Sequence, residues 1–190
     1  MLEALQTLDG GILLWIQEHL RMDWLTALLT RYTNLGEAGV IWIVIALIFL
    51  FIPKTRKAGL LSLAAMLICY VCNDLVIKNL VMRPRPFLSV EGLLPLIQRP
   101  DSYSFPSGHS CSSFAAASVW AQTLEGRWAK GAKILLLVMA MVMALSRLYV
   151  GVHYPTDVLV GSLLGVLGGW LVCRWLGPVY DRRLSKRRAE

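Results

Sequence analysis

Long apolar runs are the feature that most constrains how this chain can fold. A helix needs about 20 mainly apolar residues to cross the hydrocarbon core of a bilayer, and in lipid its backbone must satisfy its own hydrogen bonds. None of the runs shows the strict alternation of a β-strand. The sequence therefore predicts an all-α, polytopic bundle of transmembrane helices with five spans, at residues 37–53, 58–77, 105–124, 134–152 and 155–174.

The first 36 residues follow a different pattern. Charged side chains interrupt their apolar positions at Glu18, Arg21 and Asp23. Because a charge at the centre of a membrane helix costs about 2.5–3.5 kcal/mol, we expect short amphipathic helices that lie at the membrane interface, with a sixth crossing as the alternative. The expected organisation is an interfacial segment at 1–36, a transmembrane bundle at 37–177 and a basic cytoplasmic tail at 178–190.

Basic residues, which give the chain a net charge of +7, gather where apolar runs end. With five crossings, three basic regions fall on one side, and the positive-inside rule makes that side cytoplasmic. The connections 78–104 and 151–155 then face outward. The sequence has no basic stripe with interleaved aromatic residues, so we expect no nucleic-acid partner. The basic residues are Lys54, Arg56, Lys57, Arg127, Lys130, Lys133, Arg182, Arg183, Lys186, Arg187 and Arg188.

The outward connections carry an unusual set of polar residues in three groups. All three lie at the same end of their helices, so they would converge if those helices pack into one bundle. Polar and ionisable residues at a membrane are candidates for function. The groups are Lys78 with Arg83-Pro84-Arg85-Pro86, then Pro106-Ser107-Gly108-His109, and finally Ser146-Arg147 with His153 and Asp157.

Several of these residues suit a phosphate group. Lys78, Arg85 and Arg147 supply fixed positive charge and N–H donors for phosphoryl oxygens. Ser107 lies near the N-cap of an apolar helical run, where free backbone N–H groups bind anions. Gly108 would let the phosphate approach the backbone closely. Taken singly, Arg85 could instead be an anchor at the membrane interface, and Ser107 only a cap.

Two histidines and a carboxylate complete the set. A neutral imidazole can attack phosphorus and form a phosphohistidine that water later cleaves. A carboxylate on the other ring nitrogen holds the required tautomer, and Asp157, four residues after His153, could reach back to it. His109 could protonate the leaving oxygen and then activate water. The alternatives are structural: an interfacial histidine, or a carboxylate that interacts only with its helix N-terminus.

Together these residues resemble the three-part signature of the type 2 phosphatidic acid phosphatase (PAP2) superfamily. The matching parts are Lys78-x6-Arg85-Pro86, Pro106-Ser107-Gly108-His109 and Ser146-Arg147-x5-His153-x3-Asp157, and with the helices around them they cover roughly residues 35–175. The resemblance implies a hydrolase that forms a phosphohistidine without metal or other cofactor. His153 would be the nucleophile, Asp157 its partner and His109 the general acid. Phosphate binding and transition-state stabilisation would fall to Lys78, Arg85, Ser107, Gly108 and Arg147.

The resemblance also bears on the substrate. Small members with an outward site are similar to undecaprenyl-diphosphate phosphatases, which implies a lipid diphosphate in the cell (inner) membrane and an active site on its outer or periplasmic face. A phosphatidylglycerophosphate or phosphatidic acid phosphatase is the alternative, because the signature reads the phosphate and not the lipid. Outside the enzymes, a non-catalytic lipid-phosphate binding protein or a transporter could use the same cations, although the sequence shows no internal repeat of the transporter kind.

Overall fold

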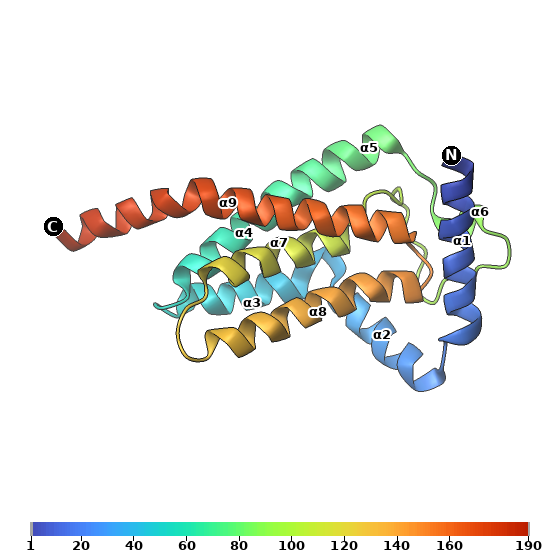
Figure 1. Ribbon diagram of the computed structural model, residues 1–190, viewed down its shortest axis with the longest axis horizontal. Helices are drawn as coiled ribbons and strands as arrows, with labels where there is room; N and C mark the ends of the chain where they lie inside the picture. Colours follow the sequence, from blue (N-terminus) through green and yellow to red (C-terminus); the bar gives the residue numbers. More distant parts are fainter. Residues whose placement is uncertain (1, 190) are drawn as a thin grey trace.

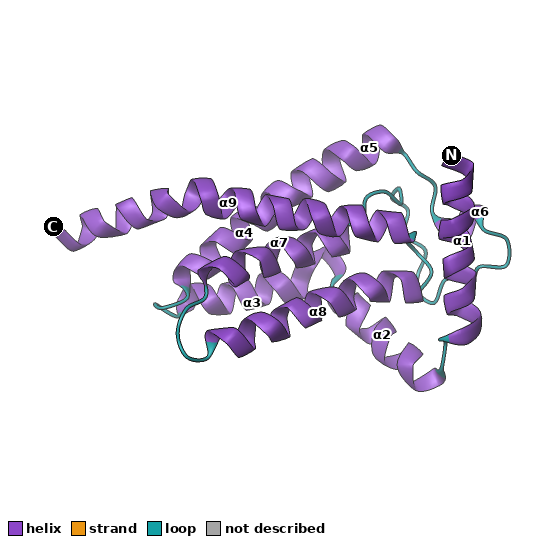
Figure 2. Cartoon of the chain, in the orientation of Figure 1, coloured by secondary structure: helices purple, strands orange, loops and turns teal. Residues whose placement is uncertain are grey.

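The computed structural model describes residues 2–189, and the side chains of residues 5–182 and 185. This part of the chain is helical and contains no strand, which confirms the all-α prediction. Figure 2 shows the helices and the loops that join them. In order, the elements are α1 (Leu2–His19), α2 (Asp23–Leu35), η1 (Glu37–Gly39), α3 (Val40–Phe51), α4 (Arg56–Tyr70), the π-helix η2 (Val71–Ile77), α5 (Lys78–Val81), α6 (Pro86–Ser89), α7 (Gly108–Thr123), α8 (Ala129–Tyr149) and α9 (Pro155–Ala189).

Helix α7 is the centre of the bundle. It packs against α4, α8 and α9, while α3 packs against α4 (Figure 1). The core between these helices mixes large aromatic side chains with small ones, which lets the helices approach closely, as is common in membrane bundles. Its fully buried members include Trp42, Ala65, Ala115, Val119 and Trp120.

Glycines bring α9 onto the backbone of α7. A Cβ built on Gly161 would lie 2.5 Å from the carbonyl oxygen of Ser107, and one on Gly165 would lie 2.9 Å from the backbone nitrogen of Ala115. A larger side chain has no room at either position, so the close approach requires glycine. The contact holds the first turn of α9 beside the first turn of α7, where two of the three motifs lie.

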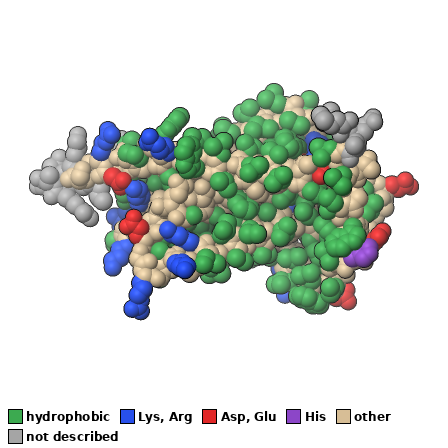
Figure 3. All heavy atoms as spheres, viewed as in Figure 1, with side chains coloured by type: hydrophobic (Ala, Val, Ile, Leu, Met, Phe, Trp, Pro, Cys, Tyr) green, Lys and Arg blue, Asp and Glu red, His purple; other side chains and the backbone are tan. Residues whose placement is uncertain are grey.

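The outside of the bundle is apolar. Figure 3 shows hydrophobic side chains over its middle. On α8 alone, Ile134, Leu135 and Leu145 are each more than half exposed, at 56%, 60% and 57%. A soluble protein rarely exposes so large a contiguous apolar area. The surface therefore indicates a membrane protein.

Helix occupies most of each of the five expected spans, but not all of these helices are long enough to cross a membrane. Helix α7 has only 16 residues. The helices Asp23–Leu35 and Glu37–Phe51 are long and apolar enough to cross a membrane only when they are counted together as one span, bent by 56°. The number of crossings, five to six, therefore stays a prediction. Within the described residues, the segments that pass alone are three: Arg56–Ser89, Ala129–Tyr149 and Pro155–Arg182.

The two ends of the bundle differ in charge. Figure 3 shows Lys and Arg side chains gathered at the end where Figure 1 places the α3–α4 and α7–α8 connections. There Lys57 pairs with Asp181 at 2.7 Å. Helix α9 continues through the expected tail at 178–190 as far as Ala189. The side chains of four basic tail residues lie outside the described ones: Arg183, Lys186, Arg187 and Arg188.

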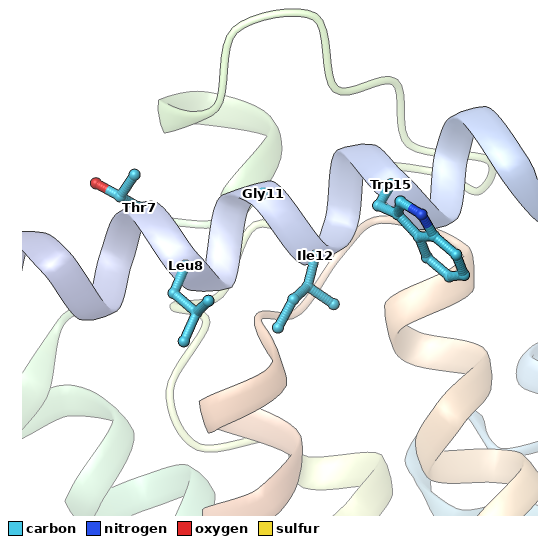
Figure 4. A pocket seen from close by; sticks show the side chains of 5 residues that line it. All are labelled: Thr7, Leu8, Gly11, Ile12 and Trp15. Atoms are coloured by element: carbon cyan, nitrogen blue, oxygen red, sulfur yellow. The ribbon is translucent and has the colours of Figure 1, made fainter.

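Helix α1 lies crosswise over the opposite end of the bundle (Figure 1). Its inner face buries Asp9 and Leu13, which are 2% and 1% exposed. On its outer face, Leu8 and Ile12 point to one side of the helix (Figure 4). That α1 is an amphipathic helix at a membrane interface stays a prediction. A shallow pocket on the outer face is lined by Thr7, Leu8, Gly11, Ile12 and Trp15.

Candidate active site

The contact between α7 and α9 positions the second motif. Ser107 occupies the N-cap of α7, where its Oγ accepts from the backbone N–H of Ser110 at 3.4 Å. The N–H of Ser107 donates to the carbonyl oxygen of Asp157 at 3.0 Å. Both helices begin here, and the free N–H groups of a helix start favour an anion. The fold therefore provides backbone donors beside the predicted phosphate-binding residues.

His153 lies in the α8–α9 connection and is 2% exposed. Its Nε2 is 2.9 Å from Nη1 of Arg85. A guanidinium has only donors, so Nε2 is the acceptor and the ring proton is on Nδ1. Nδ1 lies 3.5 Å from Oδ2 of Asp157, a contact longer than a normal N–H···O bond. This geometry gives the tautomer that a nucleophile needs, with its lone pair on Nε2.

The surroundings of His153 also keep its ring neutral. Burial lowers the pKa of His153 well below the ordinary value of 6.5, and the positive charges of Arg85, Arg147 and Lys78 lower it further. A proton on Nε2 would place a second cation among these groups. At neutral pH the imidazole is therefore uncharged and can act as a base or a nucleophile.

Arg85 is fixed from several sides. It is 4% exposed, and its Nη1 donates to the carbonyl oxygen of Val152 at 2.9 Å. Its Nε donates to the carbonyl oxygen of Ser102 at 2.8 Å, and its Nη2 to the hydroxyl of the same residue at 2.9 Å. A guanidinium held in this way presents its charge in one direction, which suits bidentate contact with a phosphoryl group.

Asp157 is fully buried in the first turn of α9. Its Oδ2 accepts from the backbone N–H of Tyr154 at 3.0 Å and from the hydroxyl of Ser104. Its Oδ1 accepts from Nη1 of Arg83 at 2.6 Å. Donors on both oxygens hold the carboxylate in one orientation toward His153.

His109 sits in the first turn of α7, beside the bend between α2 and α3. A Cβ built on Gly36 would lie 2.9 Å from its Cδ2, and within the described chain its Nε2 has no hydrogen-bond partner. Arg147, 3% exposed at the end of α8, donates from Nη1 to the hydroxyl of Thr33 at 2.6 Å. His109 interacts electrostatically with Arg147 and His153. The second and third motifs therefore meet.

Lys78 joins the site from the π-helix side. Its Nζ pairs with Oδ1 of Asp74 at 2.5 Å. The same carboxylate lies against the start of α7, because a Cβ built on Gly108 would be 2.8 Å from Asp74 Oδ1. The first and second motifs are thus linked through Asp74, whose carboxylate occupies the space beside Gly108. A close approach of phosphate to Gly108 stays a prediction.

Four polar residues to which the three-part signature assigns no role also reach the site. Asp9 and Thr33 come from the segment expected only at the interface, Asp74 comes from η2, and Arg83 follows α5. The sequence signal for Asp9 is that a carboxylate in the apolar middle of a helix needs a buried partner. No group of three or more His, Cys, Asp or Glu side chains suited to a metal ion occurs in the described part of the chain. Independence from metal stays a prediction.

Comparison with known proteins identifies the family. A family model described as the PAP2 superfamily matches residues 58–180. The chain belongs to the PAP2 superfamily. The family prediction made from the three motifs is thereby confirmed.

Relatives of this PAP2 protein are named as phosphatases of several lipids. An undecaprenyl-diphosphatase of Sulfolobus acidocaldarius is 36% identical over 125 residues, which span 66% of this chain and only 58% of that protein. A decaprenylphosphoryl-5-phosphoribose phosphatase of Mycobacterium tuberculosis is 36% identical over 141 residues, 74% of each chain. The crystal structure of a PAP2-type phosphatidylglycerolphosphate phosphatase from Bacillus subtilis superposes with a TM-score of 0.74 and 32% identity, over 95% of this chain and 87% of that one.

The PAP2 match begins at residue 58. Asp9 and Thr33 therefore lie before the part of the chain that defines the family, although each contacts a residue of the three motifs or the network around them. In this PAP2 protein the site is completed by side chains from α1 and α2.

Proposed function

We propose that this PAP2 protein is a membrane lipid phosphatase that acts through a phosphohistidine formed on His153. One observation carries the proposal: Nε2 of His153 lies 2.9 Å from the guanidinium of Arg85 while Nδ1 faces Asp157. A phosphoryl group that binds Arg85 therefore arrives at the nitrogen that holds the lone pair. The three relatives described above are each named as phosphatases, which agrees with hydrolysis of a phosphate ester or diphosphate.

In the first step, Nε2 of His153 attacks phosphorus as the bond from phosphorus to the leaving oxygen breaks. Asp157 accepts a hydrogen bond from the Nδ1–H group and stabilises the positive charge that develops on the ring. His109, whose Nε2 is unpaired within the described chain, gives a proton to the leaving oxygen. The product is a phosphohistidine and a lipid with a free hydroxyl or monophosphate.

In the second step, water attacks the phosphohistidine. His109, now neutral, takes a proton from the water, and the bond between phosphorus and Nε2 of His153 breaks, which releases inorganic phosphate. In both steps the phosphoryl oxygens bind Lys78, Arg85 and Arg147, together with the backbone at Ser107 and Gly108. These donors are fixed before reaction by their buried contacts, so little reorganisation is needed at the transition state.

Undecaprenyl diphosphate is the substrate that we favour. The relative named undecaprenyl-diphosphatase aligns with 66% of this chain. Phosphatidylglycerophosphate or phosphatidic acid is the second candidate, supported by the named function of the solved Bacillus relative. The motifs themselves bind only the phosphate, so the lipid must be discriminated by contacts beyond them.

We place the active site at the outer face of the cell membrane, periplasmic where a periplasm exists, with the C-terminus in the cytoplasm. Basic side chains gather at the end of the bundle away from α1 (Figures 1 and 3). The positive-inside rule puts that end in the cytoplasm and the site on the other side. Single cysteines placed in the α7–α8 connection and in the 90–104 loop, labelled in intact cells with an impermeant reagent, test this orientation. Labelling of the α7–α8 connection alone would reverse it.

Released phosphate tests the enzyme itself. Purified wild-type protein in detergent should release phosphate from lipid phosphates, and the His153→Ala variant should not. His19→Ala, the same change at an exposed position of α1, is the matched control and should behave as wild type. Activity should persist in EDTA. Equal release by wild type and His153→Ala would exclude the assigned nucleophile, and lipid binding without release by the wild type would favour a binding protein or transporter.

A panel of lipids tests the substrate. We expect kcat/KM to be highest for undecaprenyl diphosphate among a set that includes phosphatidylglycerophosphate and phosphatidic acid. A preference for either glycerolipid would retain the phosphatase and replace the substrate.

A further inference from the structure

The oxygen of Asp157 that does not face His153 leads into a buried polar network. Oδ1 of Asp157 accepts from Nη1 of Arg83 at 2.6 Å, and Nη2 of Arg83 donates to Oδ2 of Asp9 at 2.9 Å. The same guanidinium lies 3.8 Å from the centre of the Tyr154 ring. A single arginine therefore joins two carboxylates and an aromatic face.

Asp9 also bonds directly to α9. Its Oδ1 accepts from the backbone N–H of Thr156 at 3.3 Å, and its Oδ2 accepts from the hydroxyl of the same residue. That hydroxyl lies 2.7 Å from Nη1 of Arg83. Asp9 thus contacts both the guanidinium that holds Asp157 and the residue that precedes Asp157 in the chain.

Both carboxylates of this network are buried, so each of them needs a charged partner. Asp9 is 2% exposed and Asp157 is not exposed at all, while the side chain of Arg83 is 19% exposed. Buried carboxylates are tolerated only when they are paired and hydrogen-bonded, and here one guanidinium pairs with both. If Asp9 loses its charge, Arg83 loses one of the two carboxylates that fix it, and a guanidinium that moves while it stays bonded to Asp157 turns that carboxylate away from the imidazole.

We propose that Asp9 is a positioning residue of the active site, acting through Arg83 and Thr156 on the carboxylate that orients the nucleophile. The inference rests on the proposed function, because it assumes that His153 attacks phosphorus. Under this proposal α1 contributes a side chain to the active site, although α1 lies before residues 58–180, which match the family model. Since Asp9 acts on orientation and not on substrate, its loss should lower kcat and leave KM nearly unchanged.

The experiment compares full-length variants in detergent with undecaprenyl diphosphate as the substrate. If another lipid phosphate has a higher kcat/KM with the wild type, that lipid is used instead. We expect Asp9→Asn to lower kcat by about tenfold to a hundredfold, as when a partner that orients a reacting imidazole is removed from a metal site, with KM within about twofold. Asp9→Glu, which keeps the carboxylate, should recover part of the loss. The matched control is Asp23→Asn, the same change at an exposed position of α2, and it should behave as wild type.

A double-mutant comparison separates positioning from folding. If Asp9 acts through Asp157, Asp9→Asn should cause no further loss of kcat in an Asp157→Asn background. An equal loss in both backgrounds would overturn the proposal, because it would show that Asp9 acts independently of Asp157. If size-exclusion chromatography and thermal unfolding show that Asp9→Asn does not fold, Thr156→Val takes its place. Unchanged kcat in that variant would overturn the proposal.

The outcomes distinguish the two claims. A wild-type protein that releases no phosphate from any lipid overturns the proposed function and, with it, the role of Asp9. An active wild type together with an Asp9→Asn variant of full kcat overturns only the positioning role.

Discussion

The two histidines of the site differ in how the protein holds them. His153 has a polar neighbour at each ring nitrogen: Nη1 of Arg85 lies 2.9 Å from Nε2, and Oδ2 of Asp157, a carboxylate held by Arg83 and Ser104, lies 3.5 Å from Nδ1, beyond hydrogen-bond length. His109 is packed by the bend at Gly36, yet its Nε2 has no partner within the described residues.

This difference matches a difference in chemistry. A nucleophile must present one nitrogen in one tautomer, so rigid contacts on both sides are useful. A residue that first gives and later takes a proton must be able to bond with the leaving oxygen and with water in turn. The protein therefore holds the attacking nitrogen of one imidazole against a fixed guanidinium, and within the described residues it leaves Nε2 of the other imidazole for the reactants.

Removing the fixed imidazole should have the largest effect. His153→Ala leaves no atom to bond to phosphorus, so we expect kcat to fall on the order of 10⁴-fold or more, as for other covalent nucleophiles. Rapid quenching with lipid carrying ³²P should trap an acid-labile, base-stable phosphoenzyme in the wild type and none in the variant. A labelled variant would show that another residue forms the intermediate, and the contrast between the two histidines would fail.

Removing the second imidazole should have a smaller and substrate-dependent effect. His109→Gln takes away the general acid, so we expect lipid phosphate hydrolysis to fall by about 10²–10⁴-fold. With p-nitrophenyl phosphate, whose leaving group departs without a proton, phosphoenzyme should still form and then accumulate, because the variant also lacks the base for the second step. The same fractional loss with both substrates, and no accumulation, would assign His109 to binding instead.

Much of this site could be predicted from the sequence because its motifs sit at helix ends. Apolar runs fix the helices, and the order of the runs places Lys78, His109 and His153 at one end of the bundle. The cap at Ser107 starts α7 later than its apolar run at 105–124 suggests, which is why the helix has only 16 residues.

The contributions of α1 and α2 could not be predicted in the same way. Thr33 reaches Arg147 because the chain breaks after it, with positive φ angles of 48° at Ala38 and 72° at Gly39. Gly39 is a local signal for a break, but nothing local marks Ala38, because an alanine rarely adopts that conformation. Asp9 reaches Arg83 only because α1 folds back over the ends of the other helices, which depends on packing far away in the sequence.

Loosening Arg147 should have a moderate effect. Thr33→Val removes the hydroxyl that accepts from Arg147, and leaving a buried charged donor unpaired costs about 1–3 kcal/mol. We expect the inhibition constant for orthovanadate, a phosphate mimic, to rise about tenfold, which corresponds to about 1.4 kcal/mol. Thr30→Val is the matched control, because that hydroxyl bonds only within its own helix, to the carbonyls of Thr26 and Ala27. Equal inhibition of wild type and Thr33→Val would show that Arg147 does not depend on Thr33.

The smallest expected effect is an absence of titration at His153. Burial and three nearby cations lower its pKa well below 6.5, so the folded protein keeps the ring neutral as pH falls through the range where a free imidazole gains its proton. In ¹⁵N-histidine NMR, the signal assigned by loss in His153→Gln should keep the shifts of the neutral Nδ1–H tautomer from about pH 7.5 to about pH 6. The unfolded chain does bind that proton below 6.5, so this group stabilises the fold above that pH, and its contribution shrinks as pH falls. A signal that titrates with a midpoint near 6.5 would mean that the site does not hold the ring of His153 neutral.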